Sequence, residues 1–250
     1  MQRFINKIAV ISGGAEGLGK AIAERLGNEG ARLVLLDINE VLLQHTVQGF
    51  RQQGLQVEGL PVNVADEDQI RQAFHHVEQT CGQVHLMVNA AGIVGPTNTT
   101  ITDYSSAAFD EIYQVNLKGT FLMTKYALTL MQKKDFGRIL LIASIAGKEG
   151  NPGMVGYSAT KAGVIGLVKG VAKEYARSGI TINGLAPAVI KTAMNAKTAP
   201  AQLDYMLAKI PMNRLGTVEE VAAMSAFILS DECTFTTGFI FDLSGGRATY

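Results

Sequence analysis

Three residues in the second half of the chain have types and spacing that suit proton transfer to or from an alcohol. Tyr157 and Lys161 lie four residues apart in a helical pattern, so both side chains emerge on one helix face. A free tyrosine, with a pKa of about 10, is a poor base at neutral pH, but a nearby cation favours its phenolate. Ser144, at the end of a predicted strand, offers a hydroxyl to a substrate oxygen on which charge develops. The three residues predict acid–base chemistry on a secondary alcohol or ketone, with a separate hydride acceptor.

Alone, a tyrosine and a lysine four residues apart are a weak motif, because the pair also fits an aromatic–cation contact on a solvated helix face. The interpretation gains weight from a glycine-rich turn near the N-terminus, Ser12-Gly-Gly-Ala-Glu-Gly-Leu-Gly19, which follows one strand and opens a helix. Such a turn brings backbone N–H groups and a helix N-terminus to a pyrophosphate. The cofactor contacts expected here come from Ser12, Gly13, Glu16, Gly17, Leu18 and Gly19.

Asp37 ends the second predicted strand, eighteen residues after Gly19. A carboxylate at this place accepts hydrogen bonds from a ribose 2′-hydroxyl and repels a 2′-phosphate, which predicts NAD as the cofactor. The structural alternative is a tight turn with an aspartate that caps the next helix.

The elements that must position these residues alternate between short apolar runs and helical patterns, which predicts a parallel sheet covered on both faces. We expect one doubly wound α/β domain of the Rossmann type, with about seven strands, over residues 1–250. The predicted strands are 7–11, 32–36, 55–62, 84–88, 137–143, 180–185 and 238–242. The predicted helices are 17–29, 39–53, 66–81, 103–132, 153–178, 200–208 and 217–229.

Composition excludes several other classes. The chain of 250 residues is 47% hydrophobic and 18% charged, which is ordinary globular usage, and its 22 basic and 22 acidic side chains cancel. No basic excess points to nucleic acid, and no apolar run reaches the roughly 20 residues that a membrane helix needs. Two cysteines make no disulfide framework, and four histidines without ligand spacing predict no metal site. These features favour a soluble, cytoplasmic protein.

The spacing Gly13-x-x-x-Gly17-x-Gly19 resembles the short-chain dehydrogenase/reductase family, and the resemblance extends over about residues 6–246. Members that use NADP often carry a basic residue just before the second motif glycine, where this chain has Glu16, so Glu16 and Asp37 agree on NAD. The resemblance adds Asn116 to Ser144, Tyr157 and Lys161 as a catalytic tetrad, and implies that Tyr157 and Lys161 also touch the cofactor.

Further cofactor contacts follow from the same resemblance. Asn89-Ala-Ala-Gly92 matches the family's Asn-Ala-Gly segment beside the cofactor, through Asn89, Ala90 and Gly92. Asn63-Val64 stands where the family has Asp-Val at the adenine, and the amide of Asn63 can still accept a hydrogen bond. Pro187, Ile190 and Thr192 match the Pro-Gly-x-x-x-Thr segment at the nicotinamide carboxamide, although Ala188 replaces the glycine.

Three residues suggest an anionic substrate. Lys148 and Asn151 lie between Ser144 and Tyr157, and Arg247 near the C-terminus suits a carboxylate, which we expect it to bind in a neighbouring subunit. A solvated surface lysine is the alternative for Lys148. Gly150-Asn-Pro152 and the segment Arg-Ala-Thr-Tyr250 resemble members that oxidise 2-keto-3-deoxy sugar acids, such as 2-keto-3-deoxy-L-rhamnonate. We expect the loop at about residues 188–213 to close over the substrate, which Ser144 and Tyr157 also contact.

Two other functions are weighed against this one. A 3-oxoacyl-(acyl-carrier-protein) reductase would prefer NADPH and a basic docking patch, and a non-catalytic dinucleotide sensor would be expected to lose the Tyr/Lys pair. The resemblance also implies a homotetramer. Gly163, Gly166 and Gly170 within one predicted helix fit close packing, either by a partner helix or by this chain's own sheet.

Overall fold

All seven predicted strands pair in one parallel sheet in the computed structural model of this protein, which describes residues 2–192, 200–248 and 250. The strand order is β3-β2-β1-β4-β5-β6-β7, so the doubly wound α/β prediction is confirmed. The strands are β1 (Ile8–Ser12), β2 (Arg32–Asp37), β3 (Val57–Pro61), β4 (Leu86–Asn89), β5 (Gly137–Ile142), β6 (Ile180–Pro187) and β7 (Ile240–Leu243).

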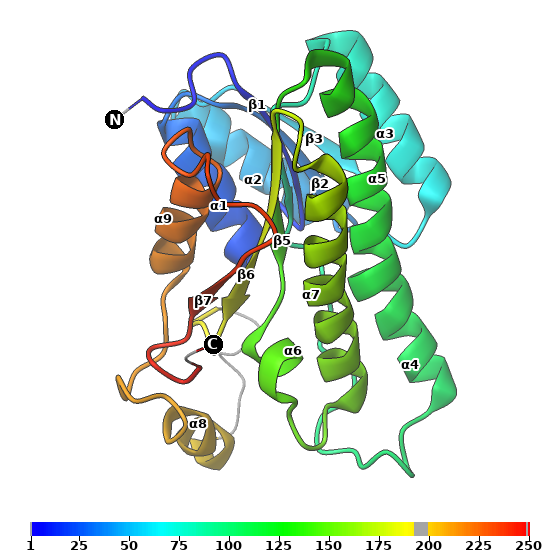
Figure 1. Cartoon of the computed structure of the whole chain (residues 1–250), viewed down its shortest axis with the longest axis vertical. Helices are drawn as coiled ribbons and strands as arrows, with labels where there is room; N and C mark the ends of the chain where they lie inside the picture. The colour runs from blue at the N-terminus through cyan, green and yellow to red at the C-terminus, as the bar shows by residue number, and fades with distance from the viewer. Residues whose placement is uncertain (1, 193–199, 249) are drawn as a thin grey trace.

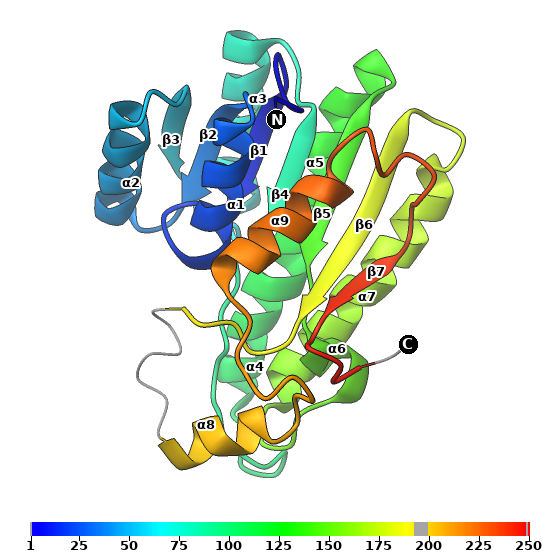
Figure 2. The same ribbon diagram turned by 90° about the vertical axis from the view of Figure 1, so that its left-hand side faces the viewer.

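Two helical layers cover the sheet (Figures 1 and 2). Helices α1, α2 and α9 pack one hydrophobic cluster against one face, through residues such as Ile22, Phe50 and Val221. Helices α3, α5 and α7 pack the other cluster, through residues such as Phe74 and Leu122. The helices are α1 (Gly17–Asn28), α2 (Glu40–Gln52), α3 (Glu67–Cys81), α4 (Ser106–Tyr113), α5 (Gly119–Met131), α6 (Ile145–Glu149), α7 (Val155–Tyr175), α8 (Pro200–Leu207) and α9 (Val218–Ile228).

Local sequence explains where these elements lie. The central strands β5 and β6 are buried along their whole length, which is why their sequences are apolar without alternation. Side chains of Asn39, Asp66 and Ser105 accept backbone N–H groups at the starts of α2, α3 and α4. Thr217 and Glu220 form a reciprocal capping box at the start of α9. All strand ends lie within two residues of the predicted ones.

Two helical predictions were wrong in detail. The expected helix 103–132 is divided into α4, a π-helical turn at Gln114–Lys118, and α5. Residues 145–149, where no helix was predicted, form the short helix α6 directly after Ser144. Both departures lie at the carboxyl edge of the sheet, where ligands bind in open α/β folds.

No helix in the described part of the chain combines the length and apolarity required to cross a bilayer. The expected substrate loop 188–213 is described only outside residues 193–199, and α8 lies within its second half.

Candidate active site

The glycine turn after β1 has the backbone shape that a close ligand approach requires. Gly13 and Gly17 have φ angles of 66° and 57°, in the left-handed region that favours glycine. A Cβ on Gly19 would lie 2.1 Å from the Gly13 carbonyl oxygen, so a larger residue would break the turn. A Cβ on Gly17 would instead project into open space. Glu16 is exposed and makes no side-chain cap at α1, which leaves the helix N-terminus suited to an anion.

Asp37 ties the end of β2 to this turn. Its Oδ2 atom accepts the Ala15 N–H at 3.1 Å, and its Oδ1 atom accepts the Asn39 N–H at 3.0 Å. Asn39, and not Asp37, provides the side-chain cap of α2, which excludes the capping alternative for Asp37. A carboxylate has about four acceptor positions, so Asp37 keeps capacity for a ribose hydroxyl while it braces the turn.

A hydrogen-bonded chain joins three elements beneath this turn. Strand register sets Ser12 opposite Asn89, and the Ser12 hydroxyl donates to Asn89 Oδ1 at 2.6 Å. Asn89 Nδ2 donates to Thr120 Oγ1 at 2.8 Å, and Thr120 in turn donates to the Asn116 carbonyl. These hydrogen bonds therefore link the glycine turn to the π-helical turn. Thr120 was not predicted, and its position four residues after Asn116 is the signal that sequence offered.

Asn116 is fully buried in the π-helical turn, and its amide is paired with one backbone unit. Oδ1 accepts the Ile93 N–H at 2.8 Å, and Nδ2 donates to the Ile93 carbonyl at 2.9 Å. A Cβ on Gly92 would lie 3.2 Å from Asn116 Oδ1 and 3.6 Å from Lys161 Nζ. Asn116 thus fixes the Gly92–Ile93 backbone beside the lysine.

Ser144, Tyr157 and Lys161 come together from two elements. Ser144 is the N-cap of α6 and accepts the Ala146 N–H at 3.1 Å, and its hydroxyl also bonds to Tyr157. Lys161 Nζ donates to the Ile142 carbonyl at the end of β5 at 2.7 Å and lies 5.8 Å from the Tyr157 ring centroid. The three residues that sequence proposed for acid–base chemistry therefore lie side by side.

Burial sets the electrostatics of this group. It lowers the pKa of Lys161 from 10.5 to about 8, because the ammonium is taken out of water. Burial also raises the pKa of Tyr157, while the hydrogen bond from Ser144 lowers it. Among the residues that the structure describes, no carboxylate forms an ion pair with Lys161. Its positive charge is therefore available to stabilise a phenolate.

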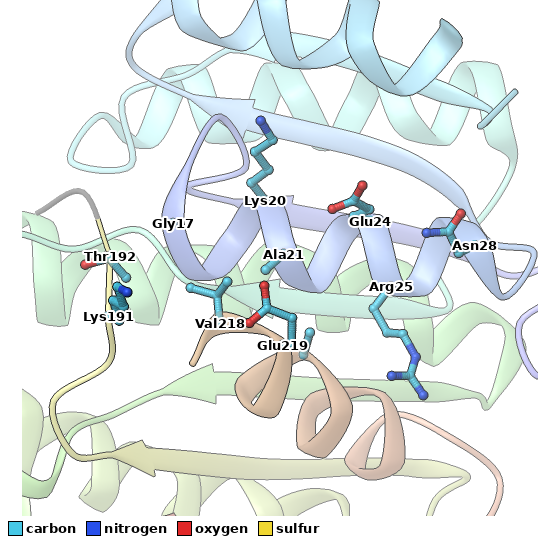
Figure 3. Close-up of a pocket in the computed structure, with 11 residues that line it drawn as sticks. Gly17, Lys20, Ala21, Glu24, Arg25, Asn28, Lys191, Thr192, Val218 and Glu219 are labelled. Carbon is cyan, nitrogen blue, oxygen red and sulfur yellow. The ribbon is translucent and has the colours of Figure 1, made fainter. Parts of the chain in front are cut away.

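A groove of about 470 Å³ runs from the glycine turn between α1 and α9 (Figure 3). Gly17 and Thr192 both line it, although they are far apart in sequence. Lys20, Lys191 and Glu219 also line it, and sequence reasoning had missed them. Their presence follows from the packing of α9 on α1, which no local motif signals.

The segment after β6 leads into this groove. β6 ends at Pro187, and Ile190 forms a parallel bridge with Gly216, where a Cβ would lie 2.5 Å from Ile190 Cδ1. Ala188 donates its N–H to the Leu243 carbonyl, so the chain continues in ordinary geometry without the family's glycine.

After β3, Asn63 Oδ1 accepts the Ala65 N–H at 2.9 Å.

The structure also describes three more of the residues expected to contact the cofactor. Val64 is buried and lies against Gly119 of α5. Leu18 and Ala90 pack against the hydrophobic cluster on the α1 face, and the Ala90 backbone adjoins Gly13. The adenine contact of Asn63-Val64 stays a prediction.

The residues expected to contact an anionic substrate have partners within this chain. Lys148 Nζ donates to Asp242 Oδ2 at 3.2 Å and to the backbone oxygen of Tyr250. Arg247 donates from two nitrogens to Glu149 Oε2, at 2.9 and 2.8 Å, and to Asn151 Oδ1 at 3.1 Å. Lys148 is therefore not a solvated surface lysine. Direct contact of Lys148 or Arg247 with a substrate carboxylate would require these bonds to open.

Comparison with known proteins agrees with this geometry. A family model described as enoyl-(acyl carrier protein) reductase matches residues 13–248. The chain is 38% identical to a 2-dehydro-3-deoxy-L-rhamnonate dehydrogenase (NAD(+)) from a Sphingomonas species, covering 99% of this chain and 98% of that protein. It is 36% identical to a 3-oxoacyl-(acyl-carrier-protein) reductase from Thermotoga maritima, covering 98% of each. A structure of NAD+-bound xylitol dehydrogenase superposes with a TM-score of 0.93 at 27% identity, covering 98% of this chain and all of the other.

Proposed function

This chain belongs to the short-chain dehydrogenase/reductase family, and on that premise we propose that it oxidises a 2-keto-3-deoxy sugar acid, with 2-keto-3-deoxy-L-rhamnonate as the first candidate. It is an NAD-dependent oxidoreductase acting on CH–OH groups. The observation that carries the proposed chemistry is the Ser144–Tyr157–Lys161 group, in which a buried ammonium without a carboxylate partner in the described chain lies beside a phenol.

The residues around the glycine turn fit NAD. Gly13, Gly17 and Gly19 would let the pyrophosphate approach the uncapped start of α1, and Asp37 would hold the adenosine ribose. The exposed carboxylate of Glu16 disfavours a 2′-phosphate nearby. Thr192 would hold the carboxamide from its place on the groove shared with Gly17. When bound, the nicotinamide supplies the hydride acceptor.

In the proposed mechanism, the phenolate form of Tyr157 is the base that takes up the proton of the substrate alcohol. Lys161 stabilises the phenolate by its charge, and Ser144 holds the substrate oxygen with its hydroxyl. Asn116 fixes Gly92 and Ile93, and so keeps the wall beside Lys161 in place. The bond from Lys161 to the Ile142 carbonyl sets the ammonium at a fixed depth under the phenol.

We further propose a cytoplasmic homotetramer. Two exposed apolar faces support the assembly: α4–α5 presents Phe109 and Phe121, and the α9–β7 side presents Phe235 and Phe239. Gly163 packs on this chain's own Leu117, whereas Cβ atoms on Gly166 and Gly170 would meet nothing within 4 Å. The last two glycines therefore favour a partner helix. Both cysteines are free thiols, which supports a reducing compartment.

The similarity to 3-oxoacyl-(acyl-carrier-protein) reductases favours a second candidate, reduction of a 3-oxoacyl thioester. One experiment compares the two. NADH formation is measured on 2-keto-3-deoxy-L-rhamnonate, simple sugars and cyclic alcohols with NAD and with NADP, and acetoacetyl-thioester reduction is followed in parallel.

We expect selective turnover of the sugar acid with NAD. Activity confined to the thioester with NADPH would overturn the proposal and the roles given to Glu16 and Asp37. Tyr157→Phe is the matched control, because it keeps the ring and removes the hydroxyl. It should abolish turnover and leave NADH binding intact, and loss of both would make Tyr157 structural.

A further inference from the structure

The segment that follows β7, described at residues 244–248 and 250, folds back against α6 and is here called the post-β7 segment. Both ribbon views draw its end beside α6 (Figures 1 and 2). Two neighbouring residues of α6 each form an ion pair with this end of the chain. Lys148 pairs with Asp242 near the end of β7, and Glu149 pairs with Arg247. The Tyr250 hydroxyl also donates to the Lys148 carbonyl at 3.1 Å.

The two cations in these pairs are largely withdrawn from water. The Lys148 and Arg247 side chains are 8% and 6% exposed, whereas their acids Asp242 and Glu149 are 26% and 28% exposed. A buried cation that loses its acid is left uncompensated, which is far more costly than loss of a surface pair.

These contacts lie close to both hydroxyl groups of the proposed mechanism, those of Ser144 and Tyr157. Ser144 caps the start of α6, and Glu149 ends it. Arg247 also donates to Asn151, whose N–H donates to Ser158 Oγ at 3.0 Å, and Ser158 follows Tyr157 directly. A five-residue helix has no stability of its own in water, so α6 depends on such tertiary contacts for its place.

We infer that Arg247 is a positioning residue, which sets Ser144 and Tyr157 relative to each other through its bonds to Glu149 and Asn151 within the same subunit. This assignment replaces direct recognition of a substrate carboxylate by Arg247. It rests on the catalytic roles proposed above for Ser144 and Tyr157, but not on which alcohol the enzyme oxidises.

The test compares Arg247→Gln, Glu149→Gln and the exchanged pair Glu149→Arg/Arg247→Glu with the wild type. Arg247→Lys is the conservative variant. Arg71→Gln is the matched control, because it removes an exposed ion pair, with Asp68, on α3. Steady-state rates are measured on the sugar acid and on its neutral amide, with NADH affinity and melting temperature alongside. Hydrogen exchange of residues 145–158 gives a readout that needs no substrate.

We expect Arg247→Gln and Glu149→Gln each to lower kcat by about 10- to 100-fold on both substrates, the size expected when reacting groups shift by about 1 Å. NADH affinity should be unchanged and exchange over 145–158 faster. The exchanged pair should recover most of the rate, and Arg247→Lys part of it. If Arg247→Gln does not fold, Glu149→Gln provides the test. It breaks the same ion pair, but it changes the more exposed partner, so the protein is expected to tolerate it better.

Direct carboxylate binding gives a different pattern and would overturn the inference. Arg247→Gln would then raise KM for the acid alone, and Glu149→Gln would leave kcat unchanged or improve binding of the acid. Unchanged exchange in both variants would also overturn it. Failure of the wild type on every alcohol would refute the proposed function, while the exchange measurement would still decide whether the segment is clamped.

Discussion

Strand β5 has a buried cation at each of its ends, and the two cations have opposite surroundings. At the amino end, Arg138 Nη1 donates to the Gly137 and Gly179 carbonyls, each at 2.9 Å. Its Nη2 reaches Asp231 at 3.4 Å, and the guanidinium lies 4.6 Å from the Phe136 ring centroid. At the carboxyl end, Lys161 makes one bond to the Ile142 carbonyl and has no carboxylate partner among the described residues.

The comparison separates a cation that maintains structure from one that is left for chemistry. Burial lowers the pKa of Arg138, but Asp231 opposes the shift, and the guanidinium stays charged at any ordinary pH. Burial lowers the pKa of Lys161 to about 8, where the charge responds to whatever binds beside it. The unfavourable burial of the Lys161 ammonium therefore lies at the end of the sheet where we propose that the substrate reacts.

Removal of the carboxyl-end cation should give the largest effect on activity. We expect Lys161→Met to lower kcat by about 10²- to 10⁴-fold, the usual contribution of acid–base catalysis, because the phenolate loses its counter-charge. The stability of this variant should instead increase relative to the wild type as the pH falls. The folded pKa of Lys161, about 8, lies below its ordinary 10.5, so this group stabilises the wild type fully only above pH 10.5, and the contribution is lost as pH falls to about 8.

Lys161→Met has no ammonium to bury, so it avoids the destabilisation that the wild type has below pH 8. Its melting temperature relative to the wild type should therefore be highest below pH 8 and lowest near pH 10.5. Thermal melts across that range, paired with NADH-formation rates at neutral pH, check both halves. A variant that retains near-normal kcat would contradict the role given to Lys161.

Removal of the amino-end cation should affect stability and spare activity. Arg138→Met leaves the Gly137 and Gly179 carbonyls without their charged donor, and we expect a loss of about 2 kcal/mol in the free energy of unfolding. Denaturant unfolding measures this loss, and kcat should stay within about twofold, since the site lies at the other end of the sheet. Asp231→Asn is the control: its carboxylate is 65% exposed, so less than about 1 kcal/mol is expected. A large drop in kcat for Arg138→Met would contradict the purely structural role given to Arg138.

The smallest effect concerns His85, which also lies at the amino edge. Its Nδ1 atom accepts the Ile8 N–H at 3.0 Å, which a protonated nitrogen cannot do. Burial, and then the charge of Lys7, lower the pKa of His85 below 6.5. Its contribution to stability is present above pH 6.5 and is lost as pH falls through the lower folded pKa, because the unfolded chain takes up the proton first. His85→Asn keeps a hydrogen-bond acceptor and should weaken this fall in melting temperature between pH 7 and pH 5. An unchanged fall would exclude His85 as its source.

Much of the fold could be predicted from sequence because its signals are local. Buried strands are continuous apolar runs, helix starts carry Asn39, Asp66 or Ser105, and glycines mark the turn at residues 13–19. The helix over 103–132 was wrongly predicted as unbroken, because a π-helical turn has no composition signal. That turn is maintained by Asn116, whose amide bonds to a loop 23 residues away. Helix α6 was missed for a similar reason: its five residues are held by the post-β7 segment, about a hundred residues further along the chain.

The sequence by itself determined the parallel α/β class, and it singled out the glycine-rich turn and the residues proposed for acid–base chemistry, since each of these signals depends on residue types and spacing along the chain. Only the tertiary structure decided which charges remain available. Lys148, Lys161 and Arg247 are equally cationic in sequence, yet two are paired with Asp242 and Glu149 while Lys161 lies buried beside a phenol. The physical reason is that the effect of a charge depends on its distance from other charges and from water, and both are set by how elements far apart in the chain pack together.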